Sequence, residues 1–161
     1  TFCMKESLKT GITFGLTSGT ITTLGLMIGL YSGTHSRSVV IGGILTIAIA
    51  DSLSDALGIH ISEEAENTHT TLEIWVATIA TFLSKLSAVI FVFPILFFEL
   101  SVAVSINLVW GISLITFLSY YLAKSQGVKP WKAILEHLLI IAVVIVLTHV
   151  TGNLIATFIN N

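Results

Sequence analysis

The sequence predicts an all-α integral membrane protein with five transmembrane helices, its N-terminus in the cytoplasm and its C-terminus outside. Composition is the first reason, because 54% of the 161 residues are hydrophobic and only 10% are charged. A soluble domain carries about 25% charged residues, so this chain has too few charges to cover a surface that faces water. The mean hydropathy of +0.96 agrees with an exterior that faces lipid.

Five long apolar runs are the second reason. Crossing a bilayer core takes about 20 mostly apolar residues in helical form. The runs are continuous and do not alternate with polar residues, which favours helices over the strands of a barrel. We expect one transmembrane domain over 1–161, whose helices cover about 10–32, 39–61, 72–98, 101–124 and 131–159.

The basic residues predict the orientation of these helices. Arg37 lies on one side of the membrane, and five lysines lie on the other. Since lysine and arginine are enriched in cytoplasmic segments, the lysine-rich side should face the cytoplasm. The acidic link expected at 62–71 then faces the cytoplasm too. The five lysines are Lys5, Lys9, Lys124, Lys129 and Lys132.

Several functional classes are disfavoured by what the sequence contains. The net charge of −2 gives no basic field for nucleic acid. A single cysteine, Cys3, excludes an intrachain disulfide and a cysteine metal cluster within one chain. Motifs of nucleotide-binding proteins, hydrolases and zinc proteases are missing, so we do not expect an enzyme. Active transport would then have to use an ion or proton gradient.

Glycines recur every four residues along the first helix. Such spacing lines up small residues on one stripe, which lets another helix approach closely in lipid. Either the stripes pack against other helices of the same chain, or the first helix lies at a homodimer seam. The first stripe holds Gly11, Gly15 and Gly19, and the second holds Gly25, Gly29 and Gly33.

Two carboxylates inside the second helix are the strongest chemical signal. Asp51 and Asp55 are four residues apart, so they share one helix face, which Ser54 extends. A carboxylate at membrane depth costs several kcal/mol unless it has a partner, a cation or a proton. Lys85, midway along the third helix, is a candidate partner for Asp51. Two carboxylates and one lysine still leave one negative charge, and oxygen ligands suit hard or borderline divalent cations.

Other titratable residues lie at or near the cytoplasmic ends of the helices. Glu136 and His137 begin the fifth helix and are either further ligands, a proton relay or an interfacial pair. His149 is deeper in that helix, where a lone histidine usually makes a structural hydrogen bond. The end of the second helix is either a solvated acidic loop or an entrance that attracts cations. Its residues are His60, Glu63, Glu64, Glu66 and His69.

The motifs of the first two helices resemble those of the vacuolar iron transporter family. TFGLTSGTITTLGLMIGL is similar to the family's opening F-G-x-x-D-G-x-x-T-T, and ADSLSDALGIHISEEAE resembles its A-D-x-x-S-M-x-x-G-E. Pro94 in the third helix, the link SQGVKPWKA and the glycine-bearing fifth helix also fit in order and spacing. The resemblance implies a homodimer with a cation pathway between the first two helices of both subunits. It also implies proton-coupled export of Fe²⁺ or Mn²⁺ from the cytosol, with no permanently bound cofactor.

Compared with the family residue by residue, this chain has one of the family's acidic residues and lacks others. Asp51 matches the family's acidic position, whereas the family's first-helix aspartate falls on Ser18. The family's methionine falls on Asp55 and its following glutamate on Ile59. The cytoplasmic metal-binding insert of some members is missing between the second and third helices. The carboxylates are therefore concentrated on one helix.

The resulting hypothesis is that this carboxylate pair alternately holds a divalent cation and protons. Two alternatives stay open: a relative that has lost transport and has a structural or regulatory role, and a carrier of another small solute. We expect a prokaryotic cell membrane, with an organellar, vacuolar-type membrane as the alternative, and the lipid bilayer and a second copy as partners. The predicted metal ligands are Asp51, Asp55, Glu63, Glu66 and His60, and the predicted coupling or pathway residues are Ser18, Ser54, Lys85, Glu136 and His137.

Overall fold

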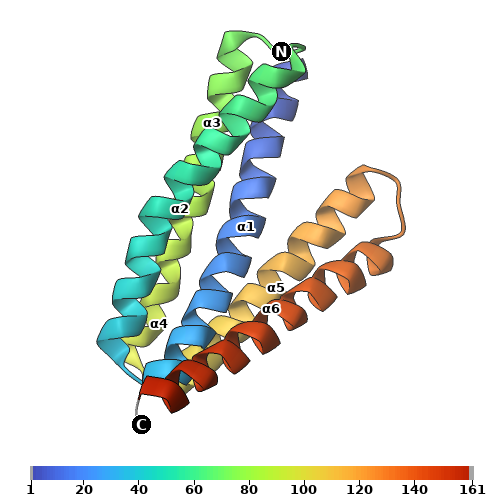
Figure 1. Ribbon diagram of the computed structural model, residues 1–161. Coiled ribbons are helices and arrows are strands. Elements are labelled where there is room, and N and C mark those ends of the chain that lie inside the picture. The colour runs from blue at the N-terminus through green and yellow to red at the C-terminus, as the bar shows by residue number, and fades with distance from the viewer. Residues whose placement is uncertain (1, 160–161) are drawn as a thin grey trace. The chain divides into compact units, whose positions relative to one another are not determined.

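The regular elements of the chain are helices throughout residues 2–159, the range that the computed structural model describes (Figure 1). Five helical stretches in this range are long and apolar enough to cross a membrane, which confirms the predicted class and number of spans. They indicate an integral membrane protein. The elements are α1 (Phe2–Thr34), α2 (Arg37–Glu66), α3 (Thr71–Leu86), the 3₁₀ helix η1 (Ser87–Phe91), α4 (Val92–Phe97), α5 (Leu100–Ser125) and α6 (Pro130–Ile159).

The link between α2 and α3 is shorter than the predicted 62–71. Helix α2 continues through the acidic residues to Glu66, because no glycine or proline interrupts it there. It stops at Asn67, whose φ of 54° is left-handed, a conformation that asparagine tolerates better than most residues. Helix α3 then begins with a capping box, in which Thr70 Oγ1 accepts from the Glu73 backbone N–H at 3.4 Å and the Glu73 carboxylate accepts from the Thr70 N–H at 2.9 Å.

The third membrane span is not the single helix predicted for 72–98. It consists of α3, the 3₁₀ turn η1 and the short α4. Pro94 explains the break, because proline lacks the N–H that would bond the carbonyl four residues earlier, which belongs to η1. The next carbonyl, that of Phe91 at the end of η1, accepts a hydrogen bond of 2.8 Å from the amide of Asn107, which is buried in α5.

The described helices form two compact units. The first unit comprises Thr1–Thr20 and Leu45–Ile90, and the second comprises Ile21–Ile44 and Phe91–Asn161. In the second unit, α5 and α6 form a helical hairpin (Figure 1). Helix α1 contributes its N-terminal half to the first unit and its C-terminal half to the second.

Both glycine stripes of α1 pack within the chain. In the first unit, a Cβ at Gly11 or Gly15 would lie 2.5 or 2.7 Å from a carbonyl oxygen of α3, which is too close for any side chain. In the second unit, a Cβ at Gly25 would lie 2.8 Å from Val144 of α6. On α6, a Cβ at Gly152 would lie 2.3 Å from the Gly29 carbonyl. The sequence left open whether the stripes pack against helices of the same chain or form a homodimer seam. In the structure they pack against helices of the same chain.

Candidate functional site

The ammonium group of Lys85 lies between the two carboxylates of α2. Lys85 Nζ is 2.6 Å from Asp51 Oδ2 and is also paired with Asp55 Oδ2. The Lys85 side chain is only 3% exposed, whereas those of Asp51 and Asp55 are 27% and 22% exposed. The ion pair predicted between Lys85 and Asp51 is confirmed, and the lysine contacts Asp55 as well. We call Asp51, Asp55, Lys85 and Ser18 the intramembrane cluster.

Ser18 ties α1 to this cluster. Lys85 Nζ donates to Ser18 Oγ at 2.9 Å, and Ser18 Oγ donates to Asp55 Oδ2 at 2.8 Å. The ammonium thus donates hydrogen bonds to Ser18 and Asp55 and has Asp51 Oδ2 as a third oxygen at ion-pair distance. The cluster joins α1, α2 and α3 of the first unit through polar contacts alone.

All four residues of the cluster lie near the middle of their membrane spans. Those spans are Met4–Thr34, Arg37–Glu66 and Thr71–Phe97. Two aspartates and one lysine carry a formal charge of −1 at that depth. Bringing any ion there costs several kcal/mol, which is only recovered through close counter-charges and hydrogen bonds. A structural ion pair needs one carboxylate for one ammonium and is then neutral. This cluster has a second carboxylate, so it carries a surplus negative charge.

The two carboxylates are held differently. Asp55 has both the ammonium and the Ser18 hydroxyl as partners. Within the described part of the chain, the buried Oδ2 of Asp51 has the ammonium as counter-charge but no aligned hydrogen-bond donor. Asp51 therefore depends more than Asp55 on Lys85 for the stabilisation of its negative charge.

Glycines on α1 allow the lysine to reach the cluster. A Cβ at Gly19 would lie 3.1 Å from Lys85 Cγ and 3.1 Å from the Lys85 carbonyl oxygen. A Cβ at Gly15 would lie 2.7 Å from the Thr81 carbonyl and 2.8 Å from Ser84 Cβ, one turn away on α3. Because α3 can approach α1 so closely, the stem of Lys85 runs along the surface of α1.

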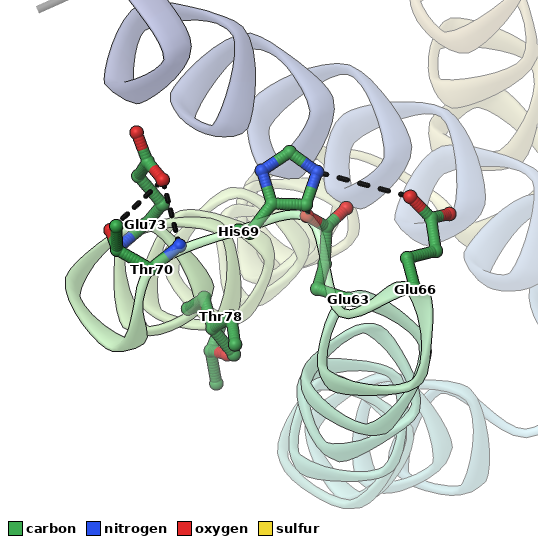
Figure 2. Close-up of polar contacts among 7 residues, drawn as sticks. Glu63, Glu66, His69, Thr70, Glu73 and Thr78 are labelled. Atoms are coloured by element: carbon green, nitrogen blue, oxygen red, sulfur yellow. Dashed lines mark hydrogen bonds and ion pairs between the residues drawn. The ribbon is translucent and has the colours of Figure 1, made fainter.

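A second polar group joins the end of α2 to the start of α3. His69 Nε2 is 3.3 Å from Glu63 Oε2 and 3.8 Å from Glu66 Oε2, and Figure 2 shows the imidazole beside both carboxylates. The adjacent capping box of Thr70 and Glu73 fixes the link that carries His69 (Figure 2). This group is the acidic end of α2, which the sequence left open as either a solvated loop or an entrance that attracts cations.

The remaining predicted site residues have other contacts or are exposed. His60 Nδ1 is 2.9 Å from Thr78 Oγ1, and its ring meets Trp75 edge-on at 4.8 Å. Ser54 is exposed on α2. In the second unit, Glu136 is exposed and His137 Nδ1 lies 2.6 Å from Ser119 Oγ.

The predicted metal ligands are therefore distributed over separate places. Asp51 and Asp55 belong to the intramembrane cluster, Glu63 and Glu66 contact His69, and His60 contacts Thr78. Among the described residues, no group of three histidine, cysteine or acidic side chains is arranged to hold a metal ion. Each chain offers a pair of carboxylates and not a closed metal cage.

Sequence reasoning missed several polar contacts in the second unit. Ser32 Oγ lies 2.6 Å from His149 Nδ1, and Asn153 Nδ2 lies 3.1 Å from His149 Nε2. These contacts confirm the interpretation of His149 as a structural hydrogen-bonding residue. Asn107 was missed as the partner of the Phe91 carbonyl. The available signal was an amide within the apolar run of α5.

Comparison with protein-family models, with curated proteins and with solved structures finds no match for this chain.

Proposed function

We propose that the chain is a secondary transporter that exports a divalent metal ion, Fe²⁺ or Mn²⁺, from the cytosol in exchange for protons. The observation that carries the proposal is the net charge of the intramembrane cluster. Asp51 and Asp55 face one ammonium, so one negative charge is left near the middle of the membrane. A cation or a proton is the simplest balance for that charge.

The accessibility of the carboxylates also supports a cation site. The Asp51 and Asp55 side chains are each about one quarter exposed, while Lys85 behind them is buried. An ion that reaches the cluster would therefore meet carboxylate oxygens first. Oxygen donors of this kind suit hard and borderline divalent cations.

The acidic end of α2 supports an entrance for cations. The half-buried Glu63 and the exposed Glu66 lie at the end of the same helix that carries the cluster. Fixed negative charge raises the local concentration of cations and accelerates their association. With the N-terminus in the cytoplasm, this end of α2 faces the cytosol, which gives export as the direction.

The resemblance to the vacuolar iron transporter family supports the metal, the protons and a homodimer. The glycine faces of α1 are already occupied by α3 in the first unit and by α6 in the second. A second copy would therefore bind through another surface. The mass of the purified protein in detergent, measured by light scattering, tests the dimer.

Transport into proteoliposomes tests the function. Uptake of Mn²⁺ and Fe²⁺ should be driven by an acidic lumen and should make the lumen more alkaline, because protons leave in exchange for each ion that enters. Asp51→Asn and Asp55→Asn should each reduce the flux at least tenfold, because each removes half of the paired charge. Glu99→Gln is the matched control, since Glu99 is exposed and its side chain makes no cap hydrogen bond. Unchanged metal flux in both aspartate variants would refute the proposal.

A structural role is the second candidate, and one observation favours it. The ammonium of Lys85 already has three oxygen partners, as in a completed ion pair. A purely structural cluster predicts that the aspartate variants lose thermal stability while the wild-type protein transports no metal. The flux assay and a thermal unfolding curve on the same preparations separate the two roles.

A further inference from the structure

The position of the Lys85 ammonium is that of a bound cation. It contacts Asp51 Oδ2 at 2.6 Å and Ser18 Oγ at 2.9 Å, and it is paired with Asp55 Oδ2. These oxygens come from α1 and α2, whereas the positive charge belongs to α3. The oxygens surround a point in space that a small free cation can fill in the same way.

Lys85 differs from a free cation because it is tethered. Its head group is a compact charge at the end of a four-carbon stem with rotatable bonds. The stem lies against Gly19, where a Cβ would come within 3.1 Å of Lys85 Cγ. Withdrawal of the ammonium from the oxygens would therefore be a rotation about the bonds of its own side chain, while the backbone of α3 stays in place.

The charges prevent the Lys85 ammonium and a divalent ion from occupying the carboxylate pair at the same time. With Lys85 in place the cluster has a charge of −1, and a divalent ion added to it would bring the total to +1. That ion and the ammonium would also share the same oxygens at contact distance, where like charges repel strongly in a medium of low dielectric constant. Binding of a divalent ion thus requires that the ammonium withdraw.

We propose that Lys85 is a tethered competitor of the transported ion: its ammonium fills the carboxylate pair in the empty carrier, and the ion enters by displacing it. This inference rests on the proposed function for the identity of the ion. The displacement weakens metal binding and assists release, because the ammonium returns as the ion leaves. It also keeps the empty cluster from carrying two unpaired carboxylates.

Binding of Mn²⁺ to the purified protein, followed by electron paramagnetic resonance, tests the competition. Lys85→Gln should bind Mn²⁺ at least tenfold more tightly than wild type, because the competing charge is gone. Lys85→Arg keeps the charge and should bind no more tightly than wild type. The double variant Asp55→Asn/Lys85→Gln has the wild-type net charge with one carboxylate, and it should lose the gain in affinity. In liposomes, Lys85→Gln should lower the half-saturating Mn²⁺ concentration and also the maximal rate.

A measurement on the wild-type chain does not depend on the folding of a variant. An amine-reactive reagent that enters the membrane should modify Lys85 faster when Mn²⁺ is saturating, because the displaced ammonium leaves its buried position. Mass spectrometry of the peptide containing Lys85 reports the modification, and Lys85→Arg is the negative control. Equal labelling with and without Mn²⁺ would overturn the displacement.

The outcomes separate this inference from the proposed function. Wild-type transport combined with unchanged or weaker Mn²⁺ binding in Lys85→Gln rejects the competitor and leaves the transporter. Tight Mn²⁺ binding by Lys85→Gln alone, with no transport by wild type, supports the competitor and rejects metal export. If wild type and Lys85→Gln both fail to bind Mn²⁺, both proposals are rejected.

Discussion

Polar side chains inside the apolar helices are paired across helices in both units. Lys85 contacts residues of α1 and α2, Ser32 of α1 contacts His149 of α6, and Ser119 of α5 contacts His137 of α6. An unsatisfied polar group in hydrocarbon costs several kcal/mol, so each contact fixes how two helices are rotated about their axes. The intramembrane cluster differs from the other pairs because it also carries a net charge.

Asn107 provides a stability test at the residue scale. Its amide donates to the carbonyl of Phe91 at 2.8 Å, next to the 3₁₀ turn, and the side chain is 1% exposed. Asn107→Ala should destabilise the protein by about 1–3 kcal/mol, because a buried carbonyl would lose its donor. Thermal unfolding in detergent measures the loss. Ser105→Ala is the control, since Ser105 is exposed and its hydroxyl donates to the Ser101 carbonyl of its own helix. Equal unfolding midpoints for the two variants would contradict the expectation.

At the scale of elements, close helix contacts depend on glycine in one place and not in another. Gly15 of α1 packs against α3, where an added Cβ would come within 2.7 Å of the Thr81 carbonyl. At Gly58 of α2, an added Cβ would have no atom of a neighbouring element within 4 Å. The same residue type therefore permits helix contact at Gly15 and only weakens the helix at Gly58.

Substitution of these glycines by alanine should have opposite effects. Gly15→Ala should cost about 1–3 kcal/mol, because α1 and α3 would have to separate. The same separation should move Lys85 away from Ser18 and reduce the metal flux. Gly58→Ala should be neutral or stabilising by up to about 1 kcal/mol, because alanine is the better helix former. Unfolding curves of the two variants decide the matter, and a stable Gly15→Ala with full activity would argue against the contact.

At the scale of the whole molecule, an odd number of spans predicts that the two ends of the chain lie on opposite sides of the membrane. The distribution of lysines predicts that the N-terminal end faces the cytoplasm. This orientation also decides which side the acidic end of α2 faces, and therefore the direction of the proposed metal transport.

Cysteine labelling tests the orientation. A membrane-impermeant maleimide should modify Cys3, the single cysteine of the sequence, only after the cells are permeabilised. In a Cys3→Ser background, Ser38→Cys should be labelled in intact cells, because the exposed Ser38 lies at the opposite end of the first two helices. The reverse pattern would invert the topology and with it the predicted direction of export.

The amino-acid sequence alone determined the class of this protein and the depth of its charges. Hydropathy and run length are local properties, so the five spans and the placement of Asp51, Asp55 and Lys85 inside them followed directly. The sequence also offered Lys85 as a candidate partner for Asp51, and the structure has this pair. The sequence did not predict the 3₁₀ turn after Lys85, although Pro94 was visible, because the conformation there also depends on donors from other helices, such as the Asn107 amide that donates to the Phe91 carbonyl.

Only the tertiary structure decided which helices the glycines serve and where each polar residue goes. Spacing places Gly15 and Gly19 on one stripe but does not say whether α3 or a second copy lies against it. Spacing likewise groups His60 with Glu63, yet the structure turns His60 to Thr78 and Glu63 to His69. These choices depend on contacts between residues far apart in the chain, whose distances no local pattern contains. The same contacts put the Lys85 ammonium between the carboxylates of α2.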